Sequence, residues 1–420
     1  MRFDVLADWL AWQETLHPQA IDLGLGRVRT VYEALRLPSP PPFTLTVGGT
    51  NGKGSCVAML TAILRAAGYR VGAYTSPHIL NYNERIAING VPATDDRIMA
   101  AFQRIDQARG DVSLSFFEFG TLAALDIFAG ENLDVQILEV GLGGRLDAVN
   151  IIDPDMALIA SIDIDHEEWL GKNRDAIGLE KAGIFRPGRH AVVGDPDIPN
   201  AVTHMAQASG VHLDRLGHEF RFETCEQGWH WMGCGIQYRQ LPLPAIPGDH
   251  QLMNASAVLQ ALHRVSERLP VSEAAIRSGL VAVRLPGRFQ FFPGKVPVLL
   301  DVAHNPQSVR VLADHLRRQF PHYRVSAVFS VMRDKDAGAM VATLRDVVDR
   351  WYLAPLGMTR AARPDELNDI LHNAGIKAIV SGFCSVQAAS DAARAEAGPG
   401  DLVLVFGSFF LVSEFLAQQG

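Results

Sequence analysis

The segment Phe43–Ser55 restricts the fold of this chain more than any other stretch. An apolar run, Phe43–Val47, leads into the glycine-rich loop Gly48–Ser55, and apolar residues at helical spacing follow it as far as Gly68. Strand, loop and helix in this order are the context of a phosphate-binding loop, because glycines let backbone N–H groups turn toward an anion at a helix start. We therefore predict that a nucleotide binds here.

The spacing of this loop differs from the common GxxxxGK[ST] motif, since only three residues separate Gly48 from Gly52. A tight turn whose glycines serve packing alone is the alternative interpretation. The lysine and the neighbouring hydroxyl groups favour a nucleotide, with Lys53 reaching the outer phosphates and Ser55 or Thr50 holding Mg²⁺.

Length and charge exclude several classes of protein. At 420 residues the chain is too long for one ordinary core, so we expect two domains or more. A composition of 48% hydrophobic and 20% charged residues is typical of a soluble globular protein. The net charge of −8 provides no basic excess for a nucleic-acid partner. No apolar run approaches the ~20 residues that a membrane span needs, so no membrane partner is expected.

Four scattered cysteines form no CxxC pair, which indicates a reduced protein without structural zinc. The N-terminal residues MRFDVLADWLAWQ carry acids and no sustained apolar core, so they are not typical of a signal peptide. These features predict a cytoplasmic location.

Three predicted strands end in polar residues that suit a metal ion. They are Ser76 after 70–74, Glu139 within 133–140, and His166 after 156–162. Chemistry in open α/β sheets collects at the carboxyl ends of strands, so these side chains should face the nucleotide loop. Glu139 is a good magnesium candidate, since a buried carboxylate needs a cation. Taken alone, Ser76 is explained better as a Ser-Pro turn opener, and Mg²⁺ usually prefers oxygen to the nitrogen of His166.

Two predicted helices leave alternatives open. The helix that starts at Ser115 places aromatic residues on both sides of Glu118, which suits a flat heteroaromatic ligand or a packed core about equally. The helix 173–184 carries Lys181, which is either a surface lysine or a group that approaches the metal. Its neighbour Glu180 should point elsewhere, because adjacent helical residues do not share a face.

The second half of the chain changes pattern twice. Residues 211–243 predict a small antiparallel β patch, and Asn254 in the following helix either reaches an adenine or phosphate group or lies in the first turn. The Pro- and Gly-rich stretch 285–294 marks a domain boundary. Beyond it, five strands alternate with four helices between Val298 and Phe406, as in a Rossmann-like unit.

We therefore predict an α/β protein with a nucleotide-binding domain at 1–286, a linker at 287–296 and a Rossmann-like domain at 297–420. Arg288 on the linker and Asp301 on the first strand beyond it are expected to enter a cleft between the domains.

Eight sequence blocks connect the chain with a known family. They are GTNGKGS at 49–55, TSPH at 75–78, FFEFGTLAAL at 116–125, LEVGLGGRLDAVN at 138–150, SIDIDHEEWLG at 161–171, EKAGIF at 180–185, LPGRF at 285–289 and DVAHNP at 301–306. In this order they resemble the folylpolyglutamate synthase/dihydrofolate synthase family, within the Mur-type ATP-dependent amide ligases. The resemblance runs from Ile21 to Phe410 and includes the unusual spacing of the phosphate loop.

The resemblance implies a P-loop-type Mur-ligase ATPase domain with a small β patch, followed by a Rossmann-like glutamate-ligase domain. It implies ATP-dependent ligation of L-glutamate to dihydropteroate and to reduced folates through an acyl phosphate, with ADP and phosphate released. ATP as co-substrate, two Mg²⁺ ions and a carbamylated Lys181 would serve this reaction. The expected partners are these small molecules, and the expected oligomeric state is a monomer.

The resemblance also assigns site residues by their place in the blocks. The implied metal ligands are Ser76, Glu139 and His166. The implied nucleotide-binding residues are Asn51, Gly52, Lys53, Gly54, Ser55, Asn254, Arg288 and Asp301. The implied catalytic residues are Lys53, Lys181 and His304. The implied pterin-binding residues are Ile21, Asp22, Leu23, Phe117, Glu118, Phe119, Leu146, Asp147 and Ala148.

Two other functions fit parts of the pattern. A Mur ligase that acts on a UDP-N-acetylmuramoyl peptide precursor would use the same chemistry, although the blocks at 116–125 and 21–27 argue against it. A P-loop nucleotide-binding regulator without ligase activity would bind nucleotide but would lack the second α/β domain and the polar strand ends.

Overall fold

The computed structural model describes residues 2–19, 21–38 and 40–418, and its contacts divide the chain into two compact units. The first unit comprises Met1–Ala245 and Gln251–Arg284, and the second comprises Ile246–His250 and Leu285–Gly420. Met1 and Gly420, which end the predicted domains, lie outside the described residues. The predicted bounds 1–286, 287–296 and 297–420 stay a prediction.

The first unit is built on a mixed sheet with the strand order β4-β3-β2-β5-β1-β6-β7-β8. Its strands are β1 (Phe43–Gly48), β2 (Val71–Tyr74), β3 (Ile86–Ile88), β4 (Val91–Pro92), β5 (Val135–Glu139), β6 (Met156–Ile159), β7 (His190–Val193) and β8 (His212–Arg215). From β2 to β8 along this order all neighbours are parallel, whereas β3 is antiparallel to β2 and to β4. β1 and β5 are buried along their whole length, as expected for strands covered on both faces.

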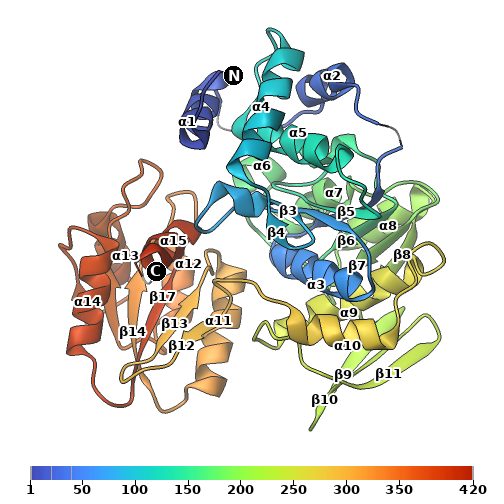
Figure 1. The fold of residues 1–420 in the computed structure, drawn as a ribbon. Coiled ribbons are helices and arrows are strands. Elements are labelled where there is room, and N and C mark those ends of the chain that lie inside the picture. The colour runs from blue at the N-terminus through green and yellow to red at the C-terminus, as the bar shows by residue number, and fades with distance from the viewer. Residues whose placement is uncertain (1, 20, 39, 419–420) are drawn as a thin grey trace. The chain divides into compact units, whose positions relative to one another are not determined.

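Helices cover both faces of this sheet, with α3 and α5 on opposite sides (Figure 1). α3 (Lys53–Ala66) packs on β1, β2 and β5, and α10 (Glu273–Ala282) packs against it. α5 (Phe116–Ala129) packs with α1 (Leu6–Leu16), α2 (Gly26–Leu35) and α4 (Asp95–Arg109). Further helical segments of this unit are η1 (Tyr82–Arg85), η2 (Ala148–Ile151), α6 (Glu167–Leu170), α7 (Arg174–Ala182), α8 (Asn200–Ala208) and, from Gln251 onward, α9 (His250–Arg264).

The register of the central strands brings three loops to one edge of the sheet. Val47 pairs with Glu139, and Gly48 pairs with Ile159. The loop after β1 therefore starts level with the end of β5 on one side and with the end of β6 on the other. Ligands bind at the carboxyl ends of strands in sheets of this kind, so this edge is the candidate ligand-binding edge of the first unit.

The predicted β patch exists, but it is smaller than 211–243. β9 (Phe220–Cys225), β10 (Gly228–Gly233) and β11 (Ile236–Leu241) form an antiparallel sheet. β8, at the start of the predicted range, instead pairs in parallel with β7 in the large sheet. The buried carboxylate of Asp214 joins β8 to α9, since it accepts a hydrogen bond from Arg264 at 2.8 Å and one from Gln260 at 2.7 Å.

The second unit has the predicted alternation of strands and helices around a mixed sheet of order β12-β13-β17-β14-β15-β16, parallel from β13 to β16. Its strands are β12 (Gln290–Phe292), β13 (Val298–Asp301), β14 (Arg324–Phe329), β15 (Arg350–Leu353), β16 (Ile379–Val380) and β17 (Asp401–Phe406). Its helices are α11 (Pro306–Gln319), α12 (Ala337–Leu344), α13 (Pro364–Asn373), α14 (Val386–Glu396) and α15 (Phe409–Ala417). β12 lies within the predicted linker and pairs antiparallel with β13. The predicted α/β fold class is confirmed.

No helix in the described part of the chain is long and apolar enough to cross a membrane.

Candidate active site

The loop after β1 has a backbone that glycine adopts without strain. Gly49 has a φ angle of 140° and Gly52 has a φ angle of 88°, a region that other L residues rarely adopt. A Cβ atom on Gly49 would lie 3.1 Å from the backbone nitrogen of Ala160, and one on Gly52 would lie 2.6 Å from Asn254 Oδ1. The structure therefore brings Asn254, predicted to bind nucleotide, directly to the phosphate loop.

Residues that follow β6 hold the loop from its other side. The backbone N–H of Thr50 donates to the carbonyl of Ser161 at 2.7 Å, and the N–H of Asn51 donates to Ser161 Oγ at 3.0 Å. Thr50 Oγ1 lies 2.9 Å from the carbonyl oxygen of Asp163, to which it donates. Sequence reasoning did not single out Ser161. The signal that could have found it is its place directly after a buried strand, within the SIDIDH block.

Lys53 begins α3 and folds back over the loop. Its Nζ donates to the carbonyl of Gly49 at 2.9 Å and to that of Thr50 at 3.1 Å. Gly54 and Ser55 lie in the first turn of α3, and Ser55 is buried. A cation over a glycine loop at a helix N-terminus can bind a phosphate group.

Two of the three predicted metal ligands lie together. Glu139 ends β5 and is 4% exposed, and its Oε2 accepts the backbone N–H of Ser76 at 3.2 Å. His166 immediately precedes α6 with a φ angle of 52°. Carboxylate, hydroxyl and imidazole donors together suit Mg²⁺ or Mn²⁺. In residues 2–19, 21–38 and 40–418, no group of three or more His, Cys, Asp and Glu side chains could hold a metal ion. The predicted metal-ligand set of Ser76, Glu139 and His166 therefore needs the Ser76 hydroxyl as its third ligand.

Lys181 is buried on α7, and its neighbour Glu180 turns outward to pair with Arg145 at 2.8 Å. The prediction that these adjacent residues point to different places is confirmed. Burial and, to a smaller extent, the charge of Lys53 lower the pKa of Lys181 to about 7, although the carboxylate of Asp165 opposes the shift. Lys181 thus lies within electrostatic reach of the phosphate loop.

Asp147 shapes the glycine-rich turn that follows β5. Its Oδ2 accepts the N–H of Leu142 at 2.8 Å, and its Oδ1 accepts the N–H of Val149 at 3.0 Å. Burial raises the pKa of Asp147 to about 6, although these hydrogen bonds and the Lys53 charge act against the rise. Its predicted partners in pterin binding, Leu146 and Ala148, flank it in this turn.

Asp22 and Glu118, both predicted to bind the pterin, are joined by Arg27. The guanidinium donates to Asp22 Oδ2 at 2.6 Å and to Glu118 Oε1 at 3.1 Å. Glu118 also accepts the N–H of Ser115 at 2.7 Å, which makes it part of a capping box at the start of α5. Ile21 and Leu23 are half-buried beside Asp22. The Glu118 carboxylate thus bonds to Arg27 and Ser115 of the protein.

The two predicted aromatic residues of α5 differ in exposure. Phe117 is half-buried, its ring centroid lies 5.9 Å from that of Tyr74, and a Cβ on Gly141 would approach Phe117 Cζ to 2.6 Å. Phe119 is fully buried, with the Phe102 ring 5.3 Å away. Phe117 can therefore reach the turn after β5, whereas Phe119 belongs to the core.

The remaining predicted site residues lie in the second unit; they are Arg288, Asp301 and His304. Asp301 accepts the N–H of Phe289 at 3.0 Å and that of Ala303 at 2.7 Å, and burial raises the pKa of Asp301 to about 6. The Arg288 guanidinium lies 5.2 Å from the Phe409 ring centroid, and the His304 ring lies 5.6 Å from the same centroid. Phe409, at the start of α15, was not predicted.

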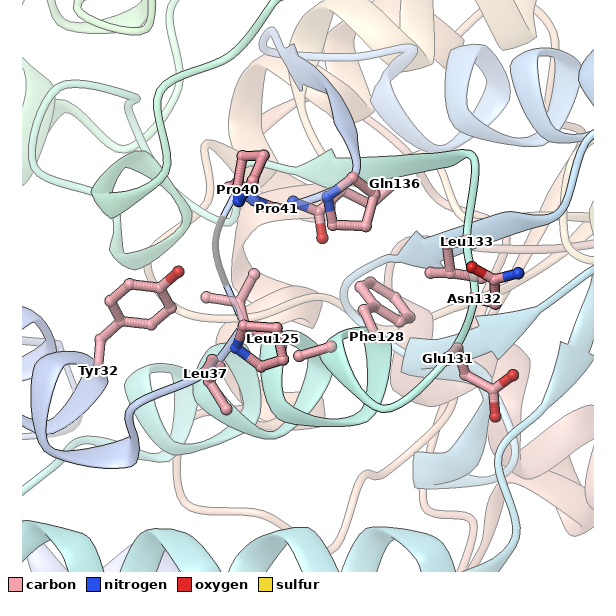
Figure 2. A pocket seen from close by; sticks show the side chains of 13 residues that line it. Tyr32, Leu37, Pro40, Pro41, Leu125, Phe128, Glu131, Asn132, Leu133 and Gln136 are labelled. Carbon is pink, nitrogen blue, oxygen red and sulfur yellow. The ribbon is translucent and has the colours of Figure 1, made fainter.

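A separate cavity of about 210 Å³ lies at the amino ends of β1 and β5 (Figure 2). Tyr32, Leu125, Phe128 and the proline residues that precede β1 line it. None of the predicted site residues lines it, and it lies at the opposite ends of the strands from the phosphate loop, so it is separate from the candidate active site.

Comparison with known proteins gives matches along the whole chain. A family model described as Mur ligase, glutamate ligase domain, matches residues 287–409. The Escherichia coli (strain K12) protein named dihydrofolate synthase/folylpolyglutamate synthase is 44% identical over 411 residues, which cover 98% of this chain and 94% of the relative.

Solved structures are similar over the same extent. Escherichia coli FolC in complex with DHPP and ADP aligns with a TM-score of 0.93 at 43% identity, covering 99% of each chain. A bifunctional folylpolyglutamate synthase/dihydrofolate synthase with Mn, AMPPNP and L-glutamate bound aligns with a TM-score of 0.91 at 44% identity, covering 99% of this chain and 98% of that one.

Proposed function

This chain belongs to the dihydrofolate synthase/folylpolyglutamate synthase family, and we propose that it joins L-glutamate to dihydropteroate and to reduced folates at the expense of ATP. It is an ATP-dependent, amide-forming ligase. The observation that carries the proposal is the phosphate loop held between Asn254 and Ser161 with Lys53 folded over it. Relatives of matching length that bind ADP or AMPPNP support it.

The reaction needs an activated acid, because a carboxylate is a poor acyl donor at neutral pH. Transfer of the γ-phosphoryl group of ATP to the acceptor carboxylate gives an acyl phosphate and ADP. The amine of L-glutamate then attacks the acyl carbon, phosphate leaves with the bonding electrons, and the amine loses a proton as the amide forms. Lys53 and the backbone N–H groups of its loop offset charge on the transferring group, which is the main task in phosphoryl transfer.

Ser76, Glu139 and His166 would hold a divalent cation, and we propose a second ion beside it. A cation there would supply charge neutralisation for the phosphate oxygens. The protein's own contribution is to keep the Glu139 carboxylate at the end of β5, where the Ser76 N–H orients it.

We propose that Lys181 is carbamylated. Carbamate formation requires an unprotonated amine, and burial of Lys181 gives it a pKa of about 7, so a large fraction is neutral at physiological pH. Carbamylation would replace the Lys181 amine near Lys53 by an anion. Carbonyl-carbon NMR after incubation with isotopically labelled bicarbonate should give a carbamate signal that Lys181→Met lacks and that a variant of exposed Lys172 retains.

Arg288 and Asp301 as nucleotide-binding residues, and His304 as a catalytic residue, stay predictions. So do a monomeric state and a cytoplasmic location. The match of residues 287–409 to a glutamate ligase domain supports a role for the second unit in using the incoming amino acid.

An acceptor assay tests the function directly. Release of ADP should depend on ATP, L-glutamate and either dihydropteroate or a reduced folate. A UDP-N-acetylmuramoyl peptide precursor offered in their place should give none. Nucleotide binding without acceptor-stimulated ADP release would contradict the proposal and favour a regulator.

Lys53→Ala tests the phosphate loop. The Lys53 side chain donates to carbonyl oxygens of its own loop and is not part of the hydrophobic core, so the variant should fold and fail to ligate. Lys377→Ala, which removes an exposed lysine of the second unit, serves as the matched control. Product formation by Lys53→Ala at the rate of the unmodified chain would refute the assignment.

A further inference from the structure

Arg85 lies beside the predicted metal ligands but belongs to none of the roles assigned so far. It ends η1 and precedes β3. Its carbonyl accepts the backbone N–H of Thr75 at 2.9 Å, and the next residue, Ser76, donates its N–H to Glu139. The antiparallel pairing of β2 with β3 therefore places Arg85 opposite Thr75, the residue that precedes the predicted metal ligand Ser76.

The guanidinium of Arg85 is held in one orientation. Its Nε donates to His78 Nδ1 at 2.9 Å. Its Cζ lies 5.4 Å from the ring centroid of Tyr82 and 5.5 Å from that of Phe116, and these two rings meet edge to face at 5.7 Å. One N–H is used by the imidazole and the flat group rests on two aromatic rings, so among the residues that the structure describes the terminal nitrogens remain for a ligand.

The charge of Arg85 lacks a carboxylate partner. Within residues 2–19, 21–38 and 40–418, its side chain forms no ion pair. Other partly buried arginines of this unit are paired, as Arg27 is with Glu118 and Arg109 is with Asp106. A half-buried guanidinium that rests on aromatic rings binds anions strongly, because both its geometry and its partial desolvation favour a bidentate carboxylate.

We propose that Arg85 binds the carboxylate of a folate acceptor that does not react. This inference rests on the proposed function. Dihydropteroate carries one carboxylate, which becomes the acyl phosphate. A folate ends in a glutamyl group with two carboxylates, of which one is activated and the other needs a partner close to the reaction centre. Arg85 is then required for the addition of L-glutamate to folates and dispensable for its addition to dihydropteroate.

The incoming L-glutamate also carries carboxylates, but the acceptor is the better match. Phe116, which supports the guanidinium, directly precedes the predicted pterin-binding residues Phe117–Phe119 in the first unit. The region that matches a glutamate ligase domain, residues 287–409, lies in the second unit.

Steady-state kinetics of Arg85→Met with both acceptors test the proposal. We expect the KM for tetrahydrofolate to rise about 10- to 100-fold, as for loss of a charge-assisted bidentate contact, while the KM for dihydropteroate changes much less. Arg85→Lys keeps the charge but loses the planar guanidinium, so its KM for tetrahydrofolate should lie between that of the unmodified chain and that of Arg85→Met. Arg109→Met is the matched control, because Arg109 also lies over a ring, Trp12 at 5.3 Å, but is paired with Asp106.

Variants of His78 test the proposal independently, because they change the hydrogen-bond partner of Arg85 and leave Arg85 itself in place. His78→Asn offers an oxygen near the position of Nδ1 and should retain most of the preference for folate, whereas His78→Leu should weaken folate binding in the same direction as Arg85→Met. A rise in the KM for L-glutamate with both acceptors would overturn the proposal and place the guanidinium on the incoming amino acid. Equal losses with both acceptors would also overturn it. If the unmodified chain used neither acceptor, the proposed function itself would fail.

Discussion

The amide oxygen of Asn254 lies 2.6 Å from the position that a Cβ atom on Gly52 would occupy. The amide nitrogen of Asn254 donates to Gln251 Oε1 at 3.0 Å, so the amide is fixed from its other end within α9. A helix that follows the loop by some two hundred residues in sequence thus limits what the phosphate loop can contain, since a side chain at 52 must displace either the amide or the loop.

Gly52→Ala should therefore weaken nucleotide binding. The φ angle of 88° and the contact with Asn254 act together, and we expect about a tenfold or greater loss of ADP affinity by calorimetry. Gly68→Ala is the matched control, because Gly68 has a φ angle of 93° but nothing within 4 Å of its added Cβ. That control should lose about 1 kcal/mol of unfolding free energy and keep its ADP affinity. Equal affinities of the two variants would contradict the prediction.

Arg27→Met should destabilise the first unit and weaken acceptor binding. The Glu118 side chain is 4% exposed and loses its cation, while that of Arg27 is 26% exposed, so we expect a loss of about 2 kcal/mol in unfolding free energy. Adding Glu118→Gln should recover part of this loss, which a double-mutant cycle in denaturant measures. Arg29→Met, at an exposed position of α2, should change little. Additive effects of the two changes would mean that the ion pair is not coupled.

The local parts of this architecture could be predicted from the sequence, and the parts decided by distant pairing could not. The apolar run, the glycines and the helical spacing after them predict β1, the loop and α3 from the local sequence alone. Ser161 acts on Asn51 only because β6 pairs with β1, which joins residues 110 positions apart. The pattern of β8 suits either sheet, and only the structure shows that β8 pairs with β7 while its Asp214 contacts distant Arg264.

Glu118 illustrates a different limit. The sequence left a ligand role and a structural role equally open, and the structure adds a capping box with Ser115 and an ion pair with Arg27. These contacts explain its burial without a ligand, while its role in pterin binding stays a prediction.

Ser161→Ala should loosen the phosphate loop without unfolding the protein. The Ser161 hydroxyl accepts the N–H of Asn51 and donates to the Asn51 carbonyl, each at 3.0 Å, so its removal leaves the middle of the loop with fewer restraints. We expect ADP affinity to fall by about tenfold. Ser266→Ala removes a hydroxyl that bonds only to its own turn, at the His263 carbonyl, and should leave the affinity unchanged. Protection of the loop amides from hydrogen exchange should fall in the first variant and not in the second.

Lys181 should make stability depend on pH in a direction set by its lowered pKa. The folded protein holds this amine with a pKa of about 7, whereas in the unfolded chain it has an ordinary value near 10.4. Between these values the unfolded state binds more protons, so this residue makes stability rise with pH. This residue costs no stability above the unfolded pKa, and its cost grows as the pH falls from that value and is complete below about 7.

Lys181→Met removes this dependence. Measured in buffers depleted of carbon dioxide, the variant should be more stable than the unmodified chain near neutral pH, by an amount on the order of a few kcal/mol, because each pKa step is worth about 1.4 kcal/mol. The difference should shrink toward pH ~10, where the amine is neutral in both states. Lys172→Met, at an exposed position, should follow the unmodified chain throughout. Denaturant titrations across this range that gave parallel curves for Lys181→Met and the unmodified chain would show that the amine is not held neutral in the fold.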